Sequence, residues 1–359
     1  MSFDIDGLVR SPGAWLDGSG EESEIVLSSR TRIARNLHGH RFTHHCDSAE
    51  LGEILRLSME AASHTRAFKH GRSAAMGEIS TLDRQILVER HMVSRDFATE
   101  SASRGLVFTQ DESVGLMVNE EDHLRIQSFA SGFDLGTAFR RANDLDDQLA
   151  PELELAYHER LGFLTACPTN LGTGMRVSVL IHLPGLVHSK EIHRLLESLR
   201  KLNHSARGLY GEGSEVMGNF FQLSNSAALG SSEEVILKNL REMVTKVITY
   251  ERRSREMLFR KARRLLEDKV WRAYGLLRYS RSVSTKEALS LISAVRMGVG
   301  VGLVTDVPLR TLNELLVYIQ PAHLQKLKGN AMDPQERDVV RAEYIREALA
   351  RDASGPGQR

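Results

Sequence analysis

The pattern of apolar residues changes near Leu229, and this change limits the possible folds more than any other feature of the sequence. Between Ile25 and Leu229, short strand-like apolar runs alternate with segments whose apolar residues recur every three or four positions. After Leu229 the chain is highly charged and keeps a helical period with little strand signal. This order predicts an α+β domain built on a sheet, followed by an all-helical domain.

Length and charge narrow the class of protein. The 359 residues suit about two domains. The 47 basic residues balance the 47 acidic ones, so any site for a polyanion must be local, and we expect no direct contact with nucleic acid or membranes. No apolar run approaches the roughly 18 residues of a membrane helix, and no export signal is evident at the start, so we expect a cytoplasmic protein. Cys46 and Cys167 are far apart, which argues against a disulfide framework.

Individual elements can be placed along the chain. The expected strands are GLVF near Leu106, VGLMV from Val114, LGFLT from Leu161 and VSVLIHL from Val177. Helical periodicity marks residues 49–65, 125–150 and 189–203, and these helices should cover one face of the sheet. In the second part, capping boxes and helix-opening prolines predict helix starts at Ser231 with Glu234, Ser284 with Glu287, Pro308, and Asp333 with Pro334.

The most informative string is CPTNLGTGMR, residues 167–176, between two expected strands. Its glycines and threonines let backbone N–H groups approach an anion, and Arg176 adds positive charge. The same string also fits a hairpin with a buried cysteine.

Three further strings carry charged side chains that could form a site. NEEDHLR, residues 119–125, places carboxylates and a guanidinium at one rim of the sheet, although a solvated helix start would look similar. In SSRTR, residues 28–32, Arg30 and Arg32 share one face of an extended segment, which suits a phosphate chain as well as a basic surface edge. RGLYGEGSE, residues 207–215, is either an ordinary exposed loop or a mobile loop that brings Glu212 or Glu215 over a substrate.

In this order and spacing, the four strings closely resemble the phosphagen (guanidino) kinase family. LVERHMVSRDF around His91 and FDLGTAFRR around Asp134 extend the resemblance over residues 25–250. The resemblance implies an α+β catalytic domain with an antiparallel sheet flanked by helices. Only 27 residues precede Ser28, where kinases of small guanidino compounds carry a helical domain.

The second half of the chain resembles one branch of that family. A helical region follows the catalytic part, and RDVVRA stands near its end at residues 337–342. Both features resemble the bacterial protein-arginine kinases, in which this motif forms a pocket for phosphorylated arginine. Arg337 and Arg341 share a helix face, so they could converge on a phosphate while Asp338 receives a guanidinium. The residues alone would also fit an ion-pair ladder along an exposed helix.

The resemblance implies four segments and a reaction. We expect an N-terminal tail (1–24), a catalytic domain (25–250), a helical dimerisation and phosphoarginine-binding domain (251–352) and a flexible tail (353–359). The reaction is transfer of the γ-phosphoryl of ATP, with Mg²⁺, to arginine side chains of proteins. Glu121 is the expected base, Glu212 the second carboxylate with Glu215 as its alternative, and Cys167 the neighbour of the substrate guanidinium.

Nucleotide-binding residues are implied by the same resemblance. They are Ser28, Ser29, Arg30, Thr31, Arg32, His91, Arg125, Arg176, Val177, Ser178, Val179, Leu180, Arg207, Gly208, Leu209, Tyr210, Gly211 and Glu212.

The implied partners are protein substrates, a Clp-type unfoldase and protease that degrades marked proteins, a stress repressor that the enzyme inactivates, and a zinc-binding activator of the McsA type. Amphipathic stretches after Leu229 also predict a homodimer. Two alternatives stay open, namely a kinase of a free guanidino metabolite such as arginine, and a catalytically idle adaptor that binds phosphorylated arginine.

Overall fold

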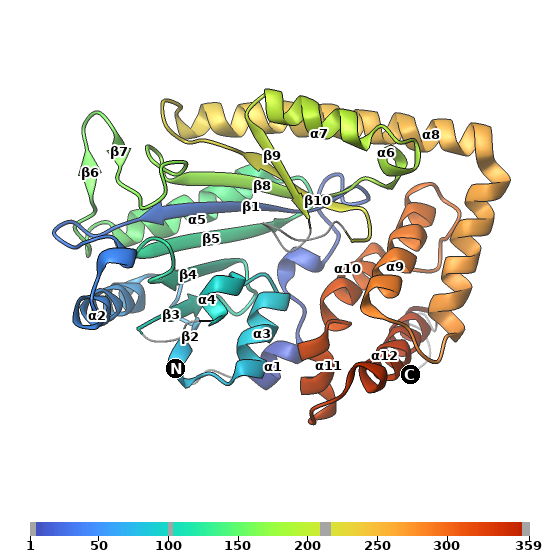
Figure 1. Cartoon of the computed structure of the whole chain (residues 1–359), viewed down its shortest axis with the longest axis horizontal. Helices are drawn as coiled ribbons and strands as arrows, with labels where there is room; N and C mark the ends of the chain where they lie inside the picture. The colour runs from blue at the N-terminus through green and yellow to red at the C-terminus, as the bar shows by residue number, and fades with distance from the viewer. Residues whose placement is uncertain (1–4, 100–102, 209–216, 354–359) are drawn as a thin grey trace.

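The computed structural model describes residues 5–99, 103–208 and 217–353. Its centre is an eight-stranded antiparallel sheet in the order β2-β3-β4-β5-β1-β8-β10-β9 (Figure 1). The strands are β1 (Val26–Arg35), β2 (Arg72–Ala75), β3 (Gly105–Phe108), β4 (Val114–Val118), β5 (Leu124–Ser131), β8 (Met175–His182), β9 (His204–Gly208) and β10 (Phe220–Asn225). The predicted α+β class with a following helical region is confirmed.

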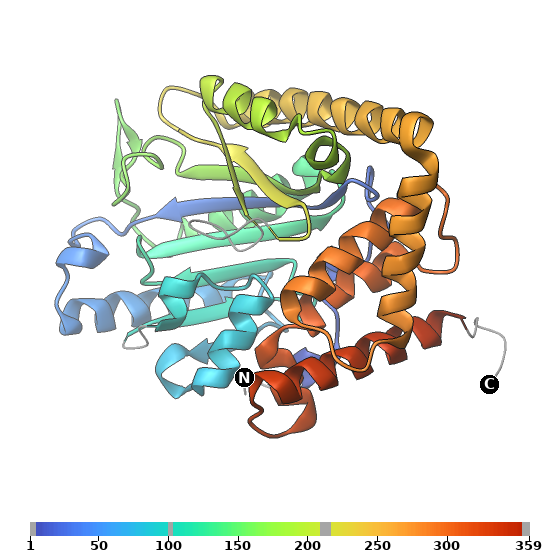
Figure 2. The same cartoon turned by 45° about the vertical axis from the view of Figure 1, so that its right-hand side comes forward.

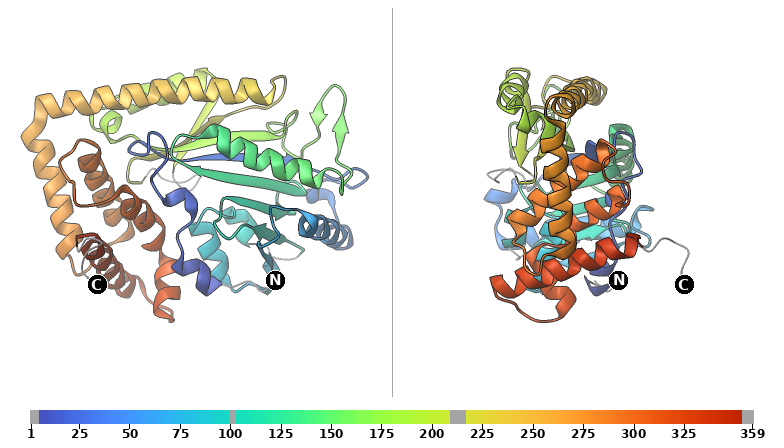
Figure 3. Two further views of the ribbon diagram at one scale, coloured as in Figure 1. Left: turned by 180° about the vertical axis from the view of Figure 1, so that it is seen from behind. Right: turned by 90° about the vertical axis from the view of Figure 1, so that its right-hand side faces the viewer.

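One face of the sheet is covered by helices. The apolar residues of α2 (Ser48–His64), α5 (Leu135–Leu149), α7 (Ile192–Lys201) and the first part of α8 (Glu233–Tyr279) share one core with the inward residues of β1, β5 and β8. Seen from behind, α5 lies across the sheet (Figure 3). Small elements complete this part, namely α6 (Pro184–His188) and the two-stranded pair β6 (Tyr157–His158) and β7 (Gly162–Phe163).

The opposite face carries the chemistry-bearing side chains and smaller packing elements. There α3 (Thr81–Glu89) and α4 (Arg95–Thr99) share a core cluster with α1 (Ile5–Arg10) and residues of β3 and β4. Trp15 of the short helix η1 (Ala14–Leu16) is buried against Phe129 of β5. The two other short helices are η2 (Thr43–His45) and η3 (Met76–Glu78). The N-terminal segment therefore packs on the sheet side that faces the helical unit.

The helical unit is tied to the sheet by the long helix α8. This helix bends at Ala262, whose backbone is non-helical, and its second part packs with α9 (Thr285–Gly300), α10 (Leu309–Tyr318), α11 (Pro321–Lys328) and α12 (Pro334–Ala353) (Figure 2). The proposed boundary at residue 250 falls within α8, 12 positions before the bend. That boundary remains a prediction.

Two details of the element prediction are wrong. Residues 125–131 form most of β5 instead of the start of a helix, because this segment pairs with both β1 and β4 in the middle of the sheet. The cap of α8 is Ser232, whose hydroxyl accepts from the Val235 N–H, and not Ser231. The cap at Ser284 is confirmed by the bond from the Glu287 N–H.

Candidate active site

A cavity of about 740 Å³ opens on the sheet face that carries α3 and α4. Five of the arginines expected at the nucleotide line it, together with the expected base, cysteine and histidine. These residues are Arg30, Arg32, Arg125, Arg176, Arg207, Glu121, Cys167 and His91. Segments far apart in the sequence therefore meet in one place, and we refer to this space as the arginine cavity.

Arg30 and Arg32 project together from β1, as the alternation of strand side chains predicts. Burial, with repulsion from Arg125, Arg176 and Arg207, lowers the pKa of Arg30 to about 9. The pKa of Arg32 is lowered well below its usual value by burial and by the neighbouring arginines, and its buried Nε has no hydrogen-bond partner. Clustered like charges of this kind favour binding of a polyanion. An anion would reduce the repulsion between the guanidinium groups and would accept a hydrogen bond from the unpaired Nε of Arg32.

The three consecutive acidic residues of the hairpin between β4 and β5 lie in different environments. Glu120 forms an ion pair with Arg125 and accepts a hydrogen bond of 2.6 Å from Ser94 Oγ. Although burial raises the pKa of Glu120, Arg125 and Ser94 lower it to about 2, so it stays ionised. Glu121 is exposed and lines the cavity, where its carboxylate can meet an entering cation.

Asp122 has a structural role that the sequence did not distinguish from the roles of its two acidic neighbours. Its Oδ1 accepts bonds of 2.7 Å from Asn36 Nδ2 and from the Ala166 N–H. Burial raises the pKa of this carboxyl. Asp122 thereby ties the hairpin that carries Glu121 to the loop that carries Cys167.

The cysteine loop lies between β7 and β8. Cys167 Sγ is 3.0 Å from Thr169 Oγ1, and the Cys167 carbonyl accepts from Thr165 Oγ1 at 2.8 Å. Gly174 has a φ of 67°, and a Cβ there would lie 2.5 Å from the Ala34 carbonyl oxygen. The glycine is needed because only it allows the loop to approach β1 this closely.

His91 borders the cavity at the end of α3. Its φ is 59°, and its ring packs edge-on against Trp15 with centroids 5.7 Å apart. Burial, with the charges of Arg30 and Arg95, lowers its pKa to about 3. The imidazole is therefore neutral at physiological pH and can pack against a ligand without adding charge.

On the opposite rim, Arg176 is held by two hydroxyl groups. Arg176 donates from Nε to Ser224 Oγ at 3.2 Å and from Nη2 to Ser205 Oγ at 2.9 Å. Arg207 of β9 also lines the cavity.

Several expected nucleotide residues do not line the cavity. Val177 and Val179 belong to the core on the helix-covered face, and Ser178 accepts from Gln222 Nε2 at 3.0 Å. The side chains absent from the cavity lining are those of Ser28, Ser29, Thr31, Val177, Ser178, Val179 and Leu180, and Gly208 also does not line it. Leu209, Tyr210, Gly211, Glu212 and the alternative Glu215 lie outside the described residues. The roles of all these residues remain predictions.

The RDVVRA motif lies on α12, in the helical unit and not among the residues lining the arginine cavity. Arg341 is fully buried and donates from Nε to the Ile319 carbonyl at 2.8 Å and from Nη1 to the Val283 carbonyl at 3.0 Å. It also pairs with Asp338 at 2.5 Å. Arg337 is less buried and donates to the Met332 carbonyl at 2.8 Å. The two arginines share a helix face, but Arg341 already supports the backbone.

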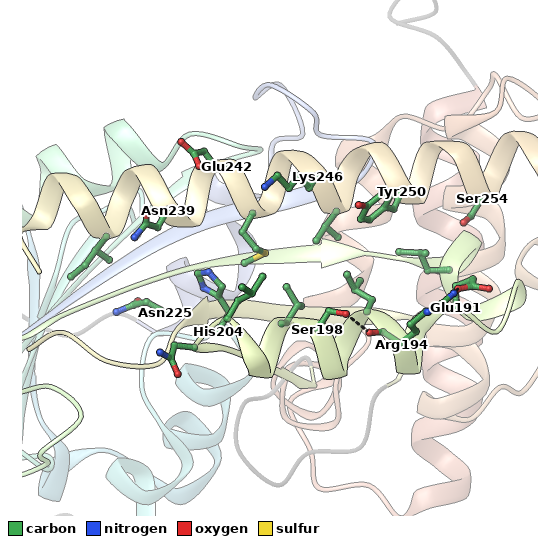
Figure 4. Close-up of a pocket in the computed structure, with 18 of the residues that line it drawn as sticks. Glu191, Arg194, Ser198, His204, Asn225, Asn239, Glu242, Lys246, Tyr250 and Ser254 are labelled. Atoms are coloured by element: carbon green, nitrogen blue, oxygen red, sulfur yellow. Dashed lines mark hydrogen bonds and ion pairs between the residues drawn. The ribbon is translucent and has the colours of Figure 1, made fainter.

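A second cavity, of about 1210 Å³, lies between α7 and α8 (Figure 4). Lys246 and Tyr250 of α8 and Ser198 of α7 line it, together with His204 of β9. It contains none of the expected site residues and lies on the helix-covered face. The smaller cavity is therefore the better candidate for chemistry.

Two features are absent from the described residues. Residues 5–99, 103–208 and 217–353 contain no group of three or more His, Cys, Asp or Glu side chains placed to hold a metal ion. Of the helices in the described part of the chain, none combines the length and apolar character required to span a membrane.

Two protein families match different parts of the chain. The family description "ATP:guanido phosphotransferase, C-terminal catalytic domain" matches residues 53–254, and "Protein-arginine kinase McsB C-terminal domain" matches residues 263–357. The chain is 42% identical over 339 residues to the protein-arginine kinase of Pelotomaculum thermopropionicum, covering 94% of this chain and 95% of the relative. It is 44% identical over 346 residues to that of Syntrophomonas wolfei, covering 95% and 96%.

Solved structures show the same fold. The duplicated taurocyamine kinase of Schistosoma mansoni, with bound transition state analog components, matches with a TM-score of 0.60 and 25% identity over 70% of this chain and 36% of that one. Lombricine kinase matches with a TM-score of 0.56 and 26% identity over 70% of this chain and 71% of that one.

The chain therefore belongs to the ATP:guanido phosphotransferase family, as its four strings predicted. It is an ATP-using phosphotransferase. Its near full-length relatives and its matching C-terminal region place it, within that family, among the protein-arginine kinases.

Proposed function

We propose that this enzyme transfers the γ-phosphoryl of ATP to a guanidinium nitrogen of arginine side chains in protein substrates. The observation that carries the proposal is the arginine cavity, where the five arginines expected at the nucleotide lie beside an exposed carboxylate and a cysteine. The guanidinium groups suit the triphosphate, and the carboxylate suits a positively charged substrate.

Glu121 is the proposed base. A guanidinium with a pKa above about 12 attacks poorly, because its lone pairs are delocalised and it carries positive charge. Glu121 would hold the guanidinium and accept its proton as the nitrogen–phosphorus bond forms and the bond to ADP breaks. Glu212 is proposed as the second carboxylate, with Glu215 as its alternative, and Cys167 as a neighbour that stabilises the cation.

The arginines would bind the triphosphate and neutralise charge in the transition state. Phosphoryl transfer depends on positioning and charge neutralisation more than on covalent help. We propose Mg²⁺ as the metal that accompanies the nucleotide, since ATP-using sites commonly hold this ion through substrate phosphates with few ligands from the protein. When bound, it supplies further charge neutralisation at the phosphates.

The test uses the full chain with ATP, Mg²⁺ and either an unstructured protein or free arginine. Label that appears as acid-labile phosphate on protein supports the proposal, whereas label on free arginine alone, or on neither, contradicts it. Glu121→Gln should reduce the rate by a factor of about 10² or more. Glu154→Gln is the matched control, because this exposed glutamate pairs with His38 and does not line the cavity. Unreduced transfer by Glu121→Gln would refute the role of this carboxylate.

We also propose the wider role that the family resemblance implies. Phosphorylated proteins would be degraded by a Clp-type unfoldase and protease, a stress repressor would be inactivated by phosphorylation, and a zinc-binding activator of the McsA type would stimulate the kinase. Arg337, Asp338 and Arg341 are the proposed phosphoarginine-binding residues. The support for these proposals is family membership and the RDVVRA motif.

A homodimer through the helical unit completes the proposal. Leu265 and Tyr279 on the second part of α8 are 72% and 74% exposed, and Leu276 on the same face is 45% exposed. Apolar side chains of this size on one helix face favour a partner surface. Asp268 and Arg272 lie between them as an exposed pair 3.7 Å apart, so two copies of the helix running antiparallel would be complementary in charge.

A further inference from the structure

A buried network joins α11 of the helical unit to the last residue of α3. The carboxylate of Glu89 accepts hydrogen bonds from the backbone N–H groups of Ala322, at 2.8 Å, and His323, at 2.9 Å. The same carboxylate lies 2.7 Å from Nδ1 of His323. The side chain of the N-cap residue of α11, Gln320, does not cap the helix, so Glu89 supplies the anion that a helix N-terminus favours.

Arg90 extends this network and fixes the tautomer of His323. Its Nη1 lies 3.4 Å from His323 Nε2, and its Nε donates to Glu112 Oε1 at 3.0 Å. Its guanidinium also lies 5.8 Å from the centre of the Tyr318 ring. Because arginine can only donate, Nε2 of His323 accepts, and the proton on Nδ1 is donated to Glu89. His323 is therefore neutral and bonded at both ring nitrogens.

The network ends at the arginine cavity. His91 directly follows Glu89 and Arg90, and it lines the cavity. Its backbone holds a positive φ of 59° and its N–H bonds to the Val88 carbonyl at 2.9 Å. A turn this tight leaves His91 little freedom to move apart from Glu89. Because α11 lies beside α3 (Figure 1), the position of α11 and the position of His91 are linked.

We propose that Glu89 and His323 are positioning residues for the kinase reaction. By docking α11 on the end of α3, they hold the His91 segment against the bound nucleotide, and the helical unit thereby helps to set the affinity for ATP. This inference rests on the proposed function, which places ATP in the arginine cavity.

The experiment compares the full chain with Glu89→Gln, His323→Leu and His323→Asn. The affinity for ATP with Mg²⁺ is measured by calorimetry, and KM for ATP and kcat are measured on an unstructured protein. Glu89→Gln and His323→Leu should weaken ATP binding and raise KM by about tenfold, as expected for the loss of a charge-assisted hydrogen bond, with kcat changed much less. His323→Asn keeps a donor near Nδ1 and should recover part of the affinity.

A matched control exists on the surface. His64 and Glu152 form an exposed pair of the same type, with Nδ1 to Oε2 at 3.3 Å. His64→Leu and Glu152→Gln should leave ATP affinity unchanged. Unchanged affinity in the network variants, or an equal loss in the surface pair, would overturn the inference.

Two further measurements keep the outcomes separate. Circular dichroism identifies any variant that loses its helices. If His323→Leu does so, Glu89→Gln decides the matter, because full parental affinity in a folded Glu89→Gln variant is incompatible with positioning. Failure of the proposed function would show differently, as a parent chain that binds ATP but places no phosphate on protein arginine.

Discussion

At the scale of single residues, Arg341 fits both a ligand-binding role and a structural role, and the sequence alone cannot distinguish them. Its spacing from Arg337 fits a phosphate clamp, yet its guanidinium is buried and bonds to two backbone carbonyls of the helical unit. An arginine in such a position stabilises the fold whether or not a ligand binds, because removing it leaves buried acceptors unpaired.

Arg341→Ala should therefore lower the free energy of unfolding by about 2–4 kcal/mol, since two buried carbonyls lose their donor. Arg337→Ala is the matched comparison and should cost less than about 1 kcal/mol, because Arg337 is more exposed and donates to one backbone carbonyl, that of Met332. Urea unfolding of both variants measures this difference. Equal stability would show that the carbonyl contacts of Arg341 contribute little, whereas the expected difference makes Arg337 the better position for testing phosphoarginine binding.

The sequence predicts the residues of the arginine cavity better than it predicts their individual roles. Arg30 and Arg32 could be assigned to one face because strand side chains alternate with a period of two. Glu120, Glu121 and Asp122 look equivalent in sequence, although the fold pairs the first with Arg125 and buries the third against Ala166. The difference depends on contacts between distant segments, which no local pattern records.

At the scale of elements, the failed assignment of residues 125–131 has the same cause. Their apolar spacing fits a helix, but pairing with strands on both sides in the centre of the sheet decides the outcome. The helices of the second part were predicted more closely, because caps and prolines act within a few residues of the helix start.

Two glycines in the helical unit give opposite predictions. A Cβ at Gly298 of α9 would lie 2.4 Å from Cγ1 of Val270 on α8, whereas nothing lies within 4 Å of a Cβ at Gly275 of α8. Gly298→Ala should destabilise the pair of helices by about 1–3 kcal/mol through overpacking. Gly275→Ala should stabilise by about 0.5–1 kcal/mol, because alanine loses less backbone entropy in a helix. Thermal unfolding measures both changes, and the same sign in both would contradict this packing.

His182 links the sheet to α9 and should make stability depend on pH. It is fully buried, stacks on Phe220 and lies with Nε2 2.8 Å from Ser293 Oγ. Burial lowers its pKa well below the usual 6.5, and Arg255 and Arg296 lower it further. The unfolded chain takes up a proton near pH 6.5 and the native chain does not, so stability is full above that pH and falls as the pH drops below it.

His182→Gln removes the group that takes up this proton, and the new amide side chain can still hydrogen-bond to Ser293. Between pH 7.5 and 5.5 it should lose about 1 kcal/mol less stability than the parent chain. Urea midpoints at the two pH values give the comparison. A parallel decline in the two proteins would mean that His182 does not contribute to the acid sensitivity.

At the scale of the whole molecule, α8 joins the sheet to the helical unit. Its first part completes the core of the sheet, and its second part, beyond Ala262, belongs to the core of the helical unit. The Glu89 network is a second connection between the sheet and the helical unit. Glu89 is separated in the sequence from its partners Ala322 and His323 by 233 and 234 positions. Such a pairing could not be predicted from the sequence, because it depends on α11 and the end of α3 meeting in the fold.

The exposed apolar face on the second part of α8 predicts that two copies of the chain associate there. If two copies pair through Leu265, Leu276 and Tyr279, a charge placed on that surface must be desolvated in the dimer and stays hydrated in the monomer. Leu265→Glu should therefore shift the chain from dimer to monomer in sedimentation at micromolar concentration. Tyr250→Glu is the control, because Tyr250 is also exposed on α8 but lies in the first part, beside α7. A parent chain that sediments as a monomer, or a Tyr250→Glu variant that dissociates equally, would place the dimer contact elsewhere or remove it.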